Sequence, residues 1–376
     1  MRILLLCTGL KTGGAEQQVA GLAQAFIQEG HDVAIVSLTP GCEVALPARA
    51  TIVHLNMRKT VTSMMRALLE LNRFVRQWQP QIIHAHMVHA NLLARVLAAV
   101  TDAPPVICTA HSAREGGRLR MLAYRLTDRW AALNSHVSES ARQAMIDAGA
   151  VVPERIVVVP NGIDTDRFLI DPELRQTTRK ALGLDAGTKL VVNVGRLVPE
   201  KAQLRLIHAF SRMIQAPGHA DTRLLIAGEG TMRSELEMAM RRHDTVGSIT
   251  LAGNRRDIPA LLNAADLFVL SSDVEGMPLV VGEALACGCP VVATDAAGVA
   301  ELVGDAGTIV SCGDTPALAR AMSDALAVGL GTPAEQARRY QRVLAHCSLE
   351  AVARSWLARY AALANAHGDV ACEGPT

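Results

Sequence analysis

Short apolar runs alternate with segments of helical periodicity along almost the whole chain. In the first half we expect strands at 2–7, 33–38, 51–54, 81–85, 105–109 and 155–159, and helices at 14–29, 60–78, 88–100, 117–131 and 138–148. Further strands are expected at 189–194, 222–227, 248–252, 266–271, 290–294 and 307–310, with helices between them. This alternation is typical of parallel sheets covered by helices on both faces, and it predicts an α/β protein.

The pattern is interrupted at NGIDTDRFLIDPE (161–173), a stretch rich in turn-forming residues that we interpret as a linker. A chain of 376 residues has enough apolar material for two cores. We therefore expect two doubly wound domains facing each other, with a site between them at the carboxyl ends of their strands. Two helices, at about 333–346 and 349–365, precede a polar tail, HGDVACEGPT, that we expect to be frayed.

The composition excludes several classes of protein. The formal net charge of +1 gives no overall bias toward nucleic acid. The first apolar run, in MRILLLCTGL, is too short for a signal peptide, and no run of about 18 apolar residues could span a membrane. The eight cysteines are scattered without a C-x-x-C pair, which fits a reducing compartment. We expect a cytoplasmic protein, either soluble or peripheral to a membrane.

Two glutamates, Glu275 and Glu283, flank a predicted helix start in SSDVEGMPLVVGEALACGCPVVAT. Pro278 suits the first turn of that helix, because its missing N–H would be unpaired there in any case. A helix N-terminus attracts an anion through its free N–H groups and its dipole. A phosphate bound there, with one carboxylate on each side to accept hydrogen bonds from sugar hydroxyls, would form a nucleotide-sugar site.

Two strand-to-helix loops carry further candidates. In TGLKTGGAEQ (8–17), Gly13 and Gly14 permit a tight turn and a close approach of a ligand, although an ordinary glycine turn remains an open alternative. In NVGRLVPEKAQ (193–203), Arg196 and Lys201 are placed near a predicted helix start. An arginine can bind phosphate oxygens at two points and a lysine supplies a point charge, so the pair suits a diphosphate. Considered alone, the two cations would more often form a solvated face.

In combination, these motifs resemble a known family. The order G-R-L-x-x-x-K, then IAGEG (226–230), then E-G-M-P-L-x-x-x-E-A-L-A-x-G-x-P-V-V is similar to the donor half of retaining glycosyltransferases of the GT-B fold, family 4. In the first half, GGAEQ, VICTAHS (106–112) and VVVPNGID (157–164) follow the order of that family. One departure is Ala202, since the family usually has glycine after the lysine. We expect this methyl group to narrow the backbone freedom only slightly.

The resemblance implies a GT-B fold of two facing Rossmann-like domains. Residues 1–165 would form the acceptor domain and 166–348 the nucleotide-sugar donor domain, while 349–376 would be a helix returning to the first domain, followed by the tail. Arg196 and Lys201 would hold the diphosphate. Glu275 would bind the transferred sugar and Glu283 the ribose. The other residues implied in donor binding are Gly13, Gly14, Gly276, Met277, Pro278, Leu279 and Val280, together with His111, which would reach the donor sugar.

The implied activity is retaining, metal-independent transfer of a hexose to a glycan or lipid-linked glycan precursor, as in cell-surface polysaccharide or lipopolysaccharide biosynthesis. A UDP-sugar is the expected donor and GDP-mannose the second choice; no permanently bound cofactor is expected. No carboxylate is obviously placed as a nucleophile, so we expect front-face substitution assisted by the leaving phosphate. A UDP-sugar 2-epimerase of similar fold and a non-catalytic sugar-nucleotide-binding protein remain alternatives.

Three other patterns have two interpretations each. Segments 56–79 and 117–130 are basic and amphipathic, so they would form either solvated helix faces or a surface for anionic lipid headgroups. For the D-x-D sequence Asp164–Thr165–Asp166, turn formation is favoured over metal binding. For the histidines of HAHMVH, packing or a role in an acceptor cleft is favoured over a metal site; they are His84, His86 and His89.

Overall fold

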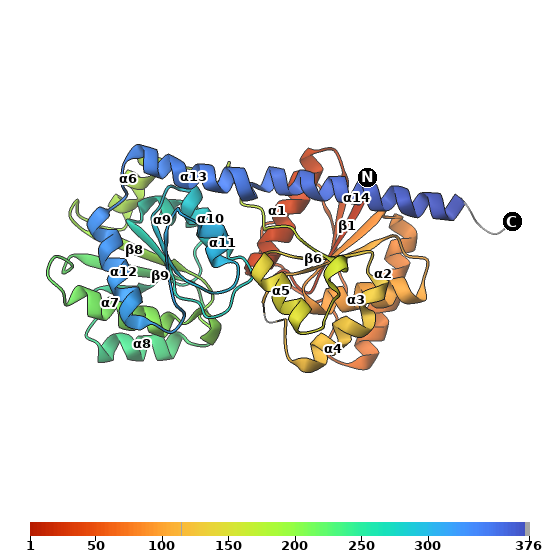
Figure 1. Cartoon of the computed structure of the whole chain (residues 1–376), viewed down its shortest axis with the longest axis horizontal. Coiled ribbons are helices and arrows are strands. Elements are labelled where there is room, and N and C mark those ends of the chain that lie inside the picture. The colour runs from red at the N-terminus through yellow and green to blue at the C-terminus, as the bar shows by residue number, and fades with distance from the viewer. Residues whose placement is uncertain (114, 373–376) are drawn as a thin grey trace. The chain divides into compact units, whose positions relative to one another are not determined.

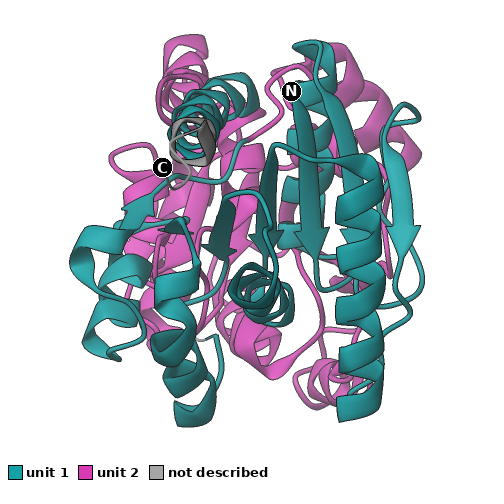
Figure 2. Cartoon of the chain, turned by 90° about the vertical axis from the view of Figure 1, so that its right-hand side faces the viewer, with its two compact units in different colours: residues 1–162, 349–376 teal, residues 163–348 magenta. Residues whose placement is uncertain are grey.

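The computed structural model describes residues 1–113 and 115–372, with side chains described as far as residue 367, and divides into two compact units. Unit 1 comprises Met1–Gly162 and Leu349–Thr376, and unit 2 comprises Ile163–Ser348 (Figure 2). Each unit contains a parallel sheet with helices on both faces, which confirms the predicted α/β class (Figure 1).

The sheet of unit 1 has the strand order β3-β2-β1-β4-β5-β6-β7, with all neighbours parallel. Its strands are β1 (Arg2–Cys7), β2 (Asp32–Ser37), β3 (Thr51–His54), β4 (Ile82–His86), β5 (Val106–Ala110), β6 (Leu133–His136) and β7 (Ile156–Val158). Every residue of β4 and of β5 is buried. Such two-sided burial is required of strands that are covered by helices on both faces.

The helices of unit 1 pack on this sheet in two layers. They are α1 (Gly14–Gln28), α2 (Val61–Trp78), α3 (Val88–Val100), α4 (Arg118–Thr127), α5 (Glu139–Asp147) and α14 (Leu349–Cys372), with short 3₁₀ helices at Asp128–Trp130 and Pro153–Arg155. Leu5 of β1 packs in the cluster formed with α1 and α14, whereas Leu4 and Leu6 pack in the cluster formed with α2 and α3. This alternation follows from the two-residue period of a strand.

Unit 2 repeats the same topology with the order β10-β9-β8-β11-β12-β13. Its strands are β8 (Lys189–Val194), β9 (Thr222–Ala227), β10 (Ile249–Leu251), β11 (Leu267–Leu270), β12 (Val291–Thr294) and β13 (Thr308–Val310). Its helices are α6 (Pro172–Ala181), α7 (Gln203–Ile214), α8 (Arg233–Arg242), α9 (Ile258–Ala264), α10 (Leu279–Ala286), α11 (Val299–Val303), α12 (Thr315–Val328) and α13 (Pro333–Cys347), with a 3₁₀ turn at Pro199–Lys201. In both sheets, successive strands are added first on one side of the unit's first strand and then on the other side. This is the Rossmann-like strand order.

The C-terminal helix α14 packs within unit 1, against α1. Trp356 and Tyr360 are almost fully buried in the same cluster as Phe26, and the Phe26 and Tyr360 rings lie 5.5 Å apart between centroids. The helix also extends to Cys372, so the tail predicted to be frayed from residue 367 is helical that far; residues 373–376 lie outside the described part of the chain. The last segment of the sequence thus completes a core that begins with its first strand.

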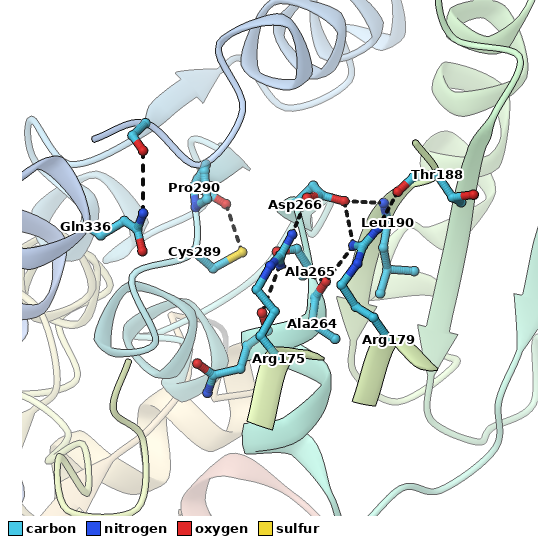
Figure 3. Close-up of polar contacts among 12 residues, drawn as sticks. Arg175, Arg179, Thr188, Leu190, Ala264, Ala265, Asp266, Cys289, Pro290 and Gln336 are labelled. Atoms are coloured by element: carbon cyan, nitrogen blue, oxygen red, sulfur yellow. Dashed lines mark hydrogen bonds and ion pairs between the residues drawn. The ribbon is translucent and has the colours of Figure 1, made fainter. Parts of the chain in front are cut away.

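Helix α6 is fixed to unit 2 by an ion-pair network. Arg175 and Arg179 contact opposite oxygens of the Asp266 carboxylate at 2.6 and 2.9 Å, and a further oxygen contact links Asp266 to the backbone N–H of Leu190 at 2.8 Å (Figure 3). Asp266 is only 5% exposed, and its bonds to two cations and an amide satisfy the buried charge. The end of the predicted linker, from Pro172 onward, is therefore an ordered part of unit 2.

Candidate functional site

In unit 2, two glycines of the IAGEG segment allow close contact between loops at the carboxyl edge of the sheet. A Cβ atom at Gly228 would lie 2.0 Å from the carbonyl oxygen of Gly195, and one at Gly230 would lie 2.2 Å from that of Leu197. A side chain at either glycine would therefore displace the loop at 195–201, which carries both cations predicted to bind phosphate. The motif has a structural function as a support for that loop.

The Lys201 ammonium contacts the Glu275 carboxylate, with 2.6 Å between Nζ and Oε1. Their side chains are 22% and 9% exposed, so solvent screens the pair less than an exposed one. Two further hydrogen bonds join the two loops: the Ser271 hydroxyl donates to the Lys201 carbonyl and the Asp273 backbone N–H donates to the Glu200 carbonyl, each at 2.9 Å. The ammonium retains two further N–H groups that can bind a ligand.

Helix α10 begins directly after the Glu275 loop. Pro278 is its N-cap residue, not a first-turn residue as the sequence indicated, and it makes no side-chain capping bond. Gly276 and Met277 before it are buried, whereas Leu279 and Val280 in the first turn are half-buried. The amides of that first turn and the helix dipole favour an anion at this end.

Glu283 lies one turn further along α10 and is half-buried. Burial raises the pKa of its carboxyl group to about 7, the Asp164 charge adds to the increase, and the Arg167 guanidinium opposes it. A carboxyl group that is partly protonated near neutral pH can both donate to and accept from a pair of hydroxyl groups. The two glutamates therefore have different surroundings: Glu275 faces a cation, and Glu283 lies beside Asp164 and Arg167.

Arg196 is exposed on the loop after β8, and its carbonyl oxygen accepts a hydrogen bond from the Gln203 side chain at 3.0 Å. Ala202, at the start of α7, has φ 48° and ψ 37°, the left-handed conformation that favours glycine. The methyl group of Ala202 therefore strains the backbone more than the sequence indicated. A cavity of about 220 Å³ lies beside Ala202 with a mainly apolar lining, and among the described residues that line it we find neither Arg196 nor Lys201.

In unit 1, His111 follows β5 and is held by His86 from the end of β4. His86 Nδ1 lies 3.0 Å from His111 Nε2, and the backbone N–H of His111 donates to Glu115 Oε1 at 3.0 Å. Burial lowers the pKa of both imidazoles, and for His111 the neighbouring His136 lowers it further. Two neutral rings can share this hydrogen bond, because one nitrogen donates and the other accepts.

His84 has a packing role beneath α14. Its Nδ1 lies 2.5 Å from the Tyr360 hydroxyl and its Nε2 lies 2.6 Å from the Thr109 hydroxyl. Its ring stands 4.4 Å from Trp356 and 4.1 Å from His86, between centroids. The interpretation of His84 as a packed residue is therefore confirmed. His86, two positions further along the strand, instead contacts His111, a predicted site residue.

Gly13 and Gly14 form the start of α1, with Gly13 as the N-cap residue in extended backbone. A Cβ atom at Gly13 would lie 2.4 Å from a carboxylate oxygen of Glu16, so the absence of a side chain lets Glu16 fold back over the helix start. A larger residue at position 13 would only require the Glu16 carboxylate to move, because that group ends a flexible side chain. Both glycines and His111 belong to unit 1, whereas the other predicted site residues belong to unit 2.

The D-x-D sequence forms a turn, as predicted. Asp164 Oδ1 accepts hydrogen bonds from the backbone N–H groups of Asp166 and Arg167 at 3.2 and 3.1 Å. Across the described ranges, we find no cluster of three or more His, Cys, Asp or Glu side chains arranged to hold a metal ion. No helix in the same ranges has both the length and the apolar character needed to cross a membrane.

Sequence reasoning did not anticipate the His86–His111 contact or the burial of His84 by Tyr360. A usable signal was the H-A-H pattern at the end of a predicted strand, because residues two apart on a strand share a face. His84 and His86 do share a face, and their positions along the strand decide which packs against α14 and which meets His111.

Two Rossmann-like units in one chain, with ligand-binding residue types at the carboxyl edge of each sheet, define the class of GT-B proteins. The sequence comparisons narrow this class. A model described as "Glycosyltransferase Family 4" matches residues 12–167, and one described as "Glycosyl transferases group 1" matches residues 188–327. The chain belongs to the GT-B glycosyltransferases of family 4.

Similar proteins include UDP-Gal:alpha-D-GlcNAc-diphosphoundecaprenol alpha-1,3-galactosyltransferase of Escherichia coli, 29% identical over 61% of this chain and 62% of the relative. A putative teichuronic acid biosynthesis glycosyltransferase, TuaC of Bacillus subtilis, is 31% identical over 61% of this chain and 57% of the relative. The matched region thus spans less than two thirds of either relative. The crystal structure of Anabaena Alr3699/HepE in complex with UDP covers 96% of this chain and 100% of its own at 21% identity, with a TM-score of 0.78, which supports the fold.

Proposed function

We propose that this protein transfers a sugar from a UDP-sugar to a glycan or lipid-linked glycan precursor, with retention of configuration and without a metal ion. The single observation that carries the proposal is the contact of Lys201 with Glu275 immediately before α10. It places a cation, a carboxylate and a helix N-terminus together, the three features needed by a diphosphate attached to a sugar. The names of the two similar bacterial enzymes and the UDP in the similar structure support the donor and the acceptor class.

In the proposed reaction, negative charge grows on the departing diphosphate. Lys201 and Arg196 would stabilise that charge together with the first-turn amides of α10. Lys201 is already held against Glu275, and a charged group held in place before the reaction requires little reorganisation in the transition state. GDP-mannose is the second candidate donor, since nothing in the contacts described selects the base.

The proposed bond changes take place on one face of the sugar. The bond between the anomeric carbon and the diphosphate oxygen breaks with its electron pair moving to the diphosphate. The acceptor oxygen bonds to the same face of the anomeric carbon, and its proton passes to the departing phosphate oxygen. In this scheme both Glu275 and Glu283 bind the donor through hydrogen bonds, and neither forms a covalent intermediate.

The two glutamates would bind different parts of the donor. Glu275, fixed by Lys201, would accept hydrogen bonds from hydroxyls of the transferred sugar, and Glu283, with its raised pKa, would bind the ribose diol. In unit 1, we assign His111 to the transferred sugar, because its imidazole is neutral and oriented by His86. Gly13 and Gly14 would allow a ligand to approach the start of α1.

The test is a transfer assay combined with binding of UDP. Lys201→Ala is expected to lower transfer by about 10²- to 10³-fold, as removal of one preorganised charge-stabilising group does. The matched control is Lys180→Ala, an exposed lysine on α6, which should leave transfer unchanged. Full transfer by folded Lys201→Ala or Glu275→Ala protein would refute the site assignment. An epimerised sugar nucleotide formed without any acceptor would favour the epimerase alternative.

We also propose contact with an anionic membrane through α2 and α4. On α4, Leu119, Leu122 and Leu126 are 83%, 49% and 64% exposed, and exposed arginines accompany them. On α2, Val61 and Leu69 are 77% and 61% exposed and share a face at helical spacing. Exposed apolar side chains beside cations are typical of helices that bind at a lipid interface.

Co-sedimentation with vesicles tests this contact. Vesicles containing anionic lipid should bind the protein more strongly than neutral ones, and added salt should weaken the binding. Leu119→Ser combined with Leu126→Ser should reduce binding, whereas Met238→Ser, at a residue 52% exposed in unit 2, should not. Equal binding to both kinds of vesicle at all salt concentrations would rule out the electrostatic contribution.

A further inference from the structure

A cavity of about 210 Å³ lies at the carboxyl edge of the unit 1 sheet. Its lining residues follow three different strands: Thr8 after β1, Met87 to His89 after β4, and Ser112 after β5, with Glu115 and Arg120 from the next segment. The strand order reverses between β1 and β4, and a doubly wound sheet binds its ligands in the crevice at that reversal. The position therefore favours a ligand site.

Beside Met87, Val88 and Glu115, the lining of this cavity carries one cation, Arg120, and the side chains of Thr8, His89 and Ser112, which can donate hydrogen bonds. Arg120 lines it from α4, and His89 lies in the first turn of α3, whose N-cap residue makes no side-chain capping bond. The pKa of His89 is lowered mainly by burial and further by the charges of Arg120 and Lys59. A helix N-terminus and the Arg120 cation in the lining together favour an anion.

Glu115 and Thr8 line the same cavity. The Glu115 carboxylate is already bound, because Oε1 accepts the backbone N–H groups of His111 and Ser112 at 3.0 and 3.1 Å, and burial raises the pKa of this group against its negative charge. The Thr8 hydroxyl is a buried atom for which the described residues provide no hydrogen-bond partner. Buried hydroxyls are almost always hydrogen-bonded, so this one calls for a ligand or a water molecule.

We propose that this cavity binds a phosphate or diphosphate group of the acceptor. The inference rests on the proposed function and names the acceptor chemistry. A volume of about 210 Å³ is below the roughly 300 Å³ at which pockets begin to enclose drug-sized ligands, so it suits a charged group and not a whole glycan. Among the described lining residues we find no Phe, Tyr or Trp on which a sugar could stack. The phosphate could belong to a lipid headgroup or to a free sugar phosphate.

The experiment is a titration of the full chain with inorganic pyrophosphate at saturating UDP, so that the proposed donor site in unit 2 is already filled. Wild-type protein should still bind pyrophosphate saturably. Arg120→Gln should weaken this binding by 10- to 100-fold, as expected for a lost charged hydrogen bond. The matched control, Arg125→Gln on the exposed side of the same helix, and the donor-site variant Lys201→Ala should both retain it.

Competition then identifies the source of the phosphate. Displacement of pyrophosphate by a short-chain isoprenyl diphosphate but not by glucose 1-phosphate supports a lipid headgroup, and the reverse supports a free sugar phosphate. No saturable pyrophosphate binding at saturating UDP, or equal binding by wild-type and Arg120→Gln protein, would overturn the inference. Such a result together with normal UDP binding would leave the proposed function intact, whereas loss of UDP binding by the wild-type protein would contradict that function itself.

Discussion

The two units share one strand order but build the carboxyl edges of their sheets from different chemistry. In unit 2, the candidate site pairs a charged lysine with a charged carboxylate, Lys201 with Glu275. In unit 1, the predicted residue is an imidazole, His111, held by a second imidazole whose burial keeps it neutral. One topology can therefore support a site that stabilises charge or a site that offers neutral hydrogen bonds. The residues in the loops that follow two adjacent strands decide which of the two is formed.

The largest expected effect separates the two units by stability. Trp356→Ala removes a side chain that is 2% exposed in the core of unit 1 and contacts His84, so it should destabilise unit 1 by about 3–5 kcal/mol. Hydrogen exchange measured by peptide should increase in β1 and β4 and remain unchanged in β8 and β11. Arg354→Ala, at an exposed position of the same helix, should change stability by less than about 0.5 kcal/mol. Equal increases in both units would show that they unfold as one.

The next effect tests whether the charged pair in unit 2 serves stability or activity. Lys201→Met leaves the Glu275 carboxylate, 8% exposed, without its cation, which should destabilise unit 2 by about 3 kcal/mol. Adding Glu275→Leu should restore most of that stability, because the buried charge is gone, while transfer remains abolished. Denaturant unfolding and transfer assays of the single and double variants measure both quantities. Recovery of transfer by the double variant would contradict a catalytic function for the pair.

Acid should act in opposite directions on Glu283 of unit 2 and on two buried histidines of unit 1. In unit 2, the folded pKa of Glu283 is raised to about 7, so its ionisation costs stability as the pH rises from about 4.5 to 7. Glu283→Gln should remove that pH dependence, on the order of 3 kcal/mol, and also weaken UDP binding. In unit 1, the folded pKa values of His84 and His86 are lowered, so stability falls as the pH drops below about 6.5, where the unfolded histidines take up protons. Unfolding of each unit followed by hydrogen exchange at pH 5, 6, 7 and 8 measures both slopes, and a unit 2 slope that Glu283→Gln leaves unchanged would contradict the contribution of Glu283.

The smallest effect concerns the loop beside Lys201. Ala202→Gly should stabilise unit 2 by about 0.5–1 kcal/mol, because glycine adopts φ 48° without the strain of a Cβ atom. Ala186→Gly, in an exposed turn with ordinary backbone, should be neutral or slightly destabilising. Thermal unfolding of the two variants is the measurement. A destabilised Ala202→Gly protein would indicate that the methyl group makes a packing contribution larger than its strain.

The sequence predicted most strands because they are continuous apolar runs, and it missed β6 for a physical reason. Three of the four residues of β6 are polar and nevertheless buried. Asn134 is bonded to Arg95 and Asp128, and Ser135 is bonded to Thr109. These partners satisfy the polar groups inside the sheet, so a search for apolar alternation finds no strand there.

For the site, sequence motifs identified the residue types but not their contacts. Lys201 and Glu275 are 74 positions apart, and their contact depends on the adjacency of β8 and β11 in the sheet. The burial that raises the pKa of Glu283 likewise depends on surrounding segments, including the turn at Asp164. Which strands are neighbours, and how deeply a helix is buried, are tertiary properties that no local pattern contains. The assigned roles of these residues remain predictions.

The position of α14 has a consequence for the biosynthesis of the protein. Unit 2 is continuous in the chain, so all of its residues have been synthesised before the first residue of α14 is joined. Unit 1 begins at the first residue, yet the cluster that contains its first strand also contains Trp356 and Tyr360. During translation, unit 1 therefore lacks the part of this cluster that α14 supplies beside α1, while unit 2 can already fold. Synthesis of unit 1 thus begins before that of unit 2 and ends after it. A chain released before α14 is synthesised would contain all of unit 2 but would expose apolar surface on unit 1.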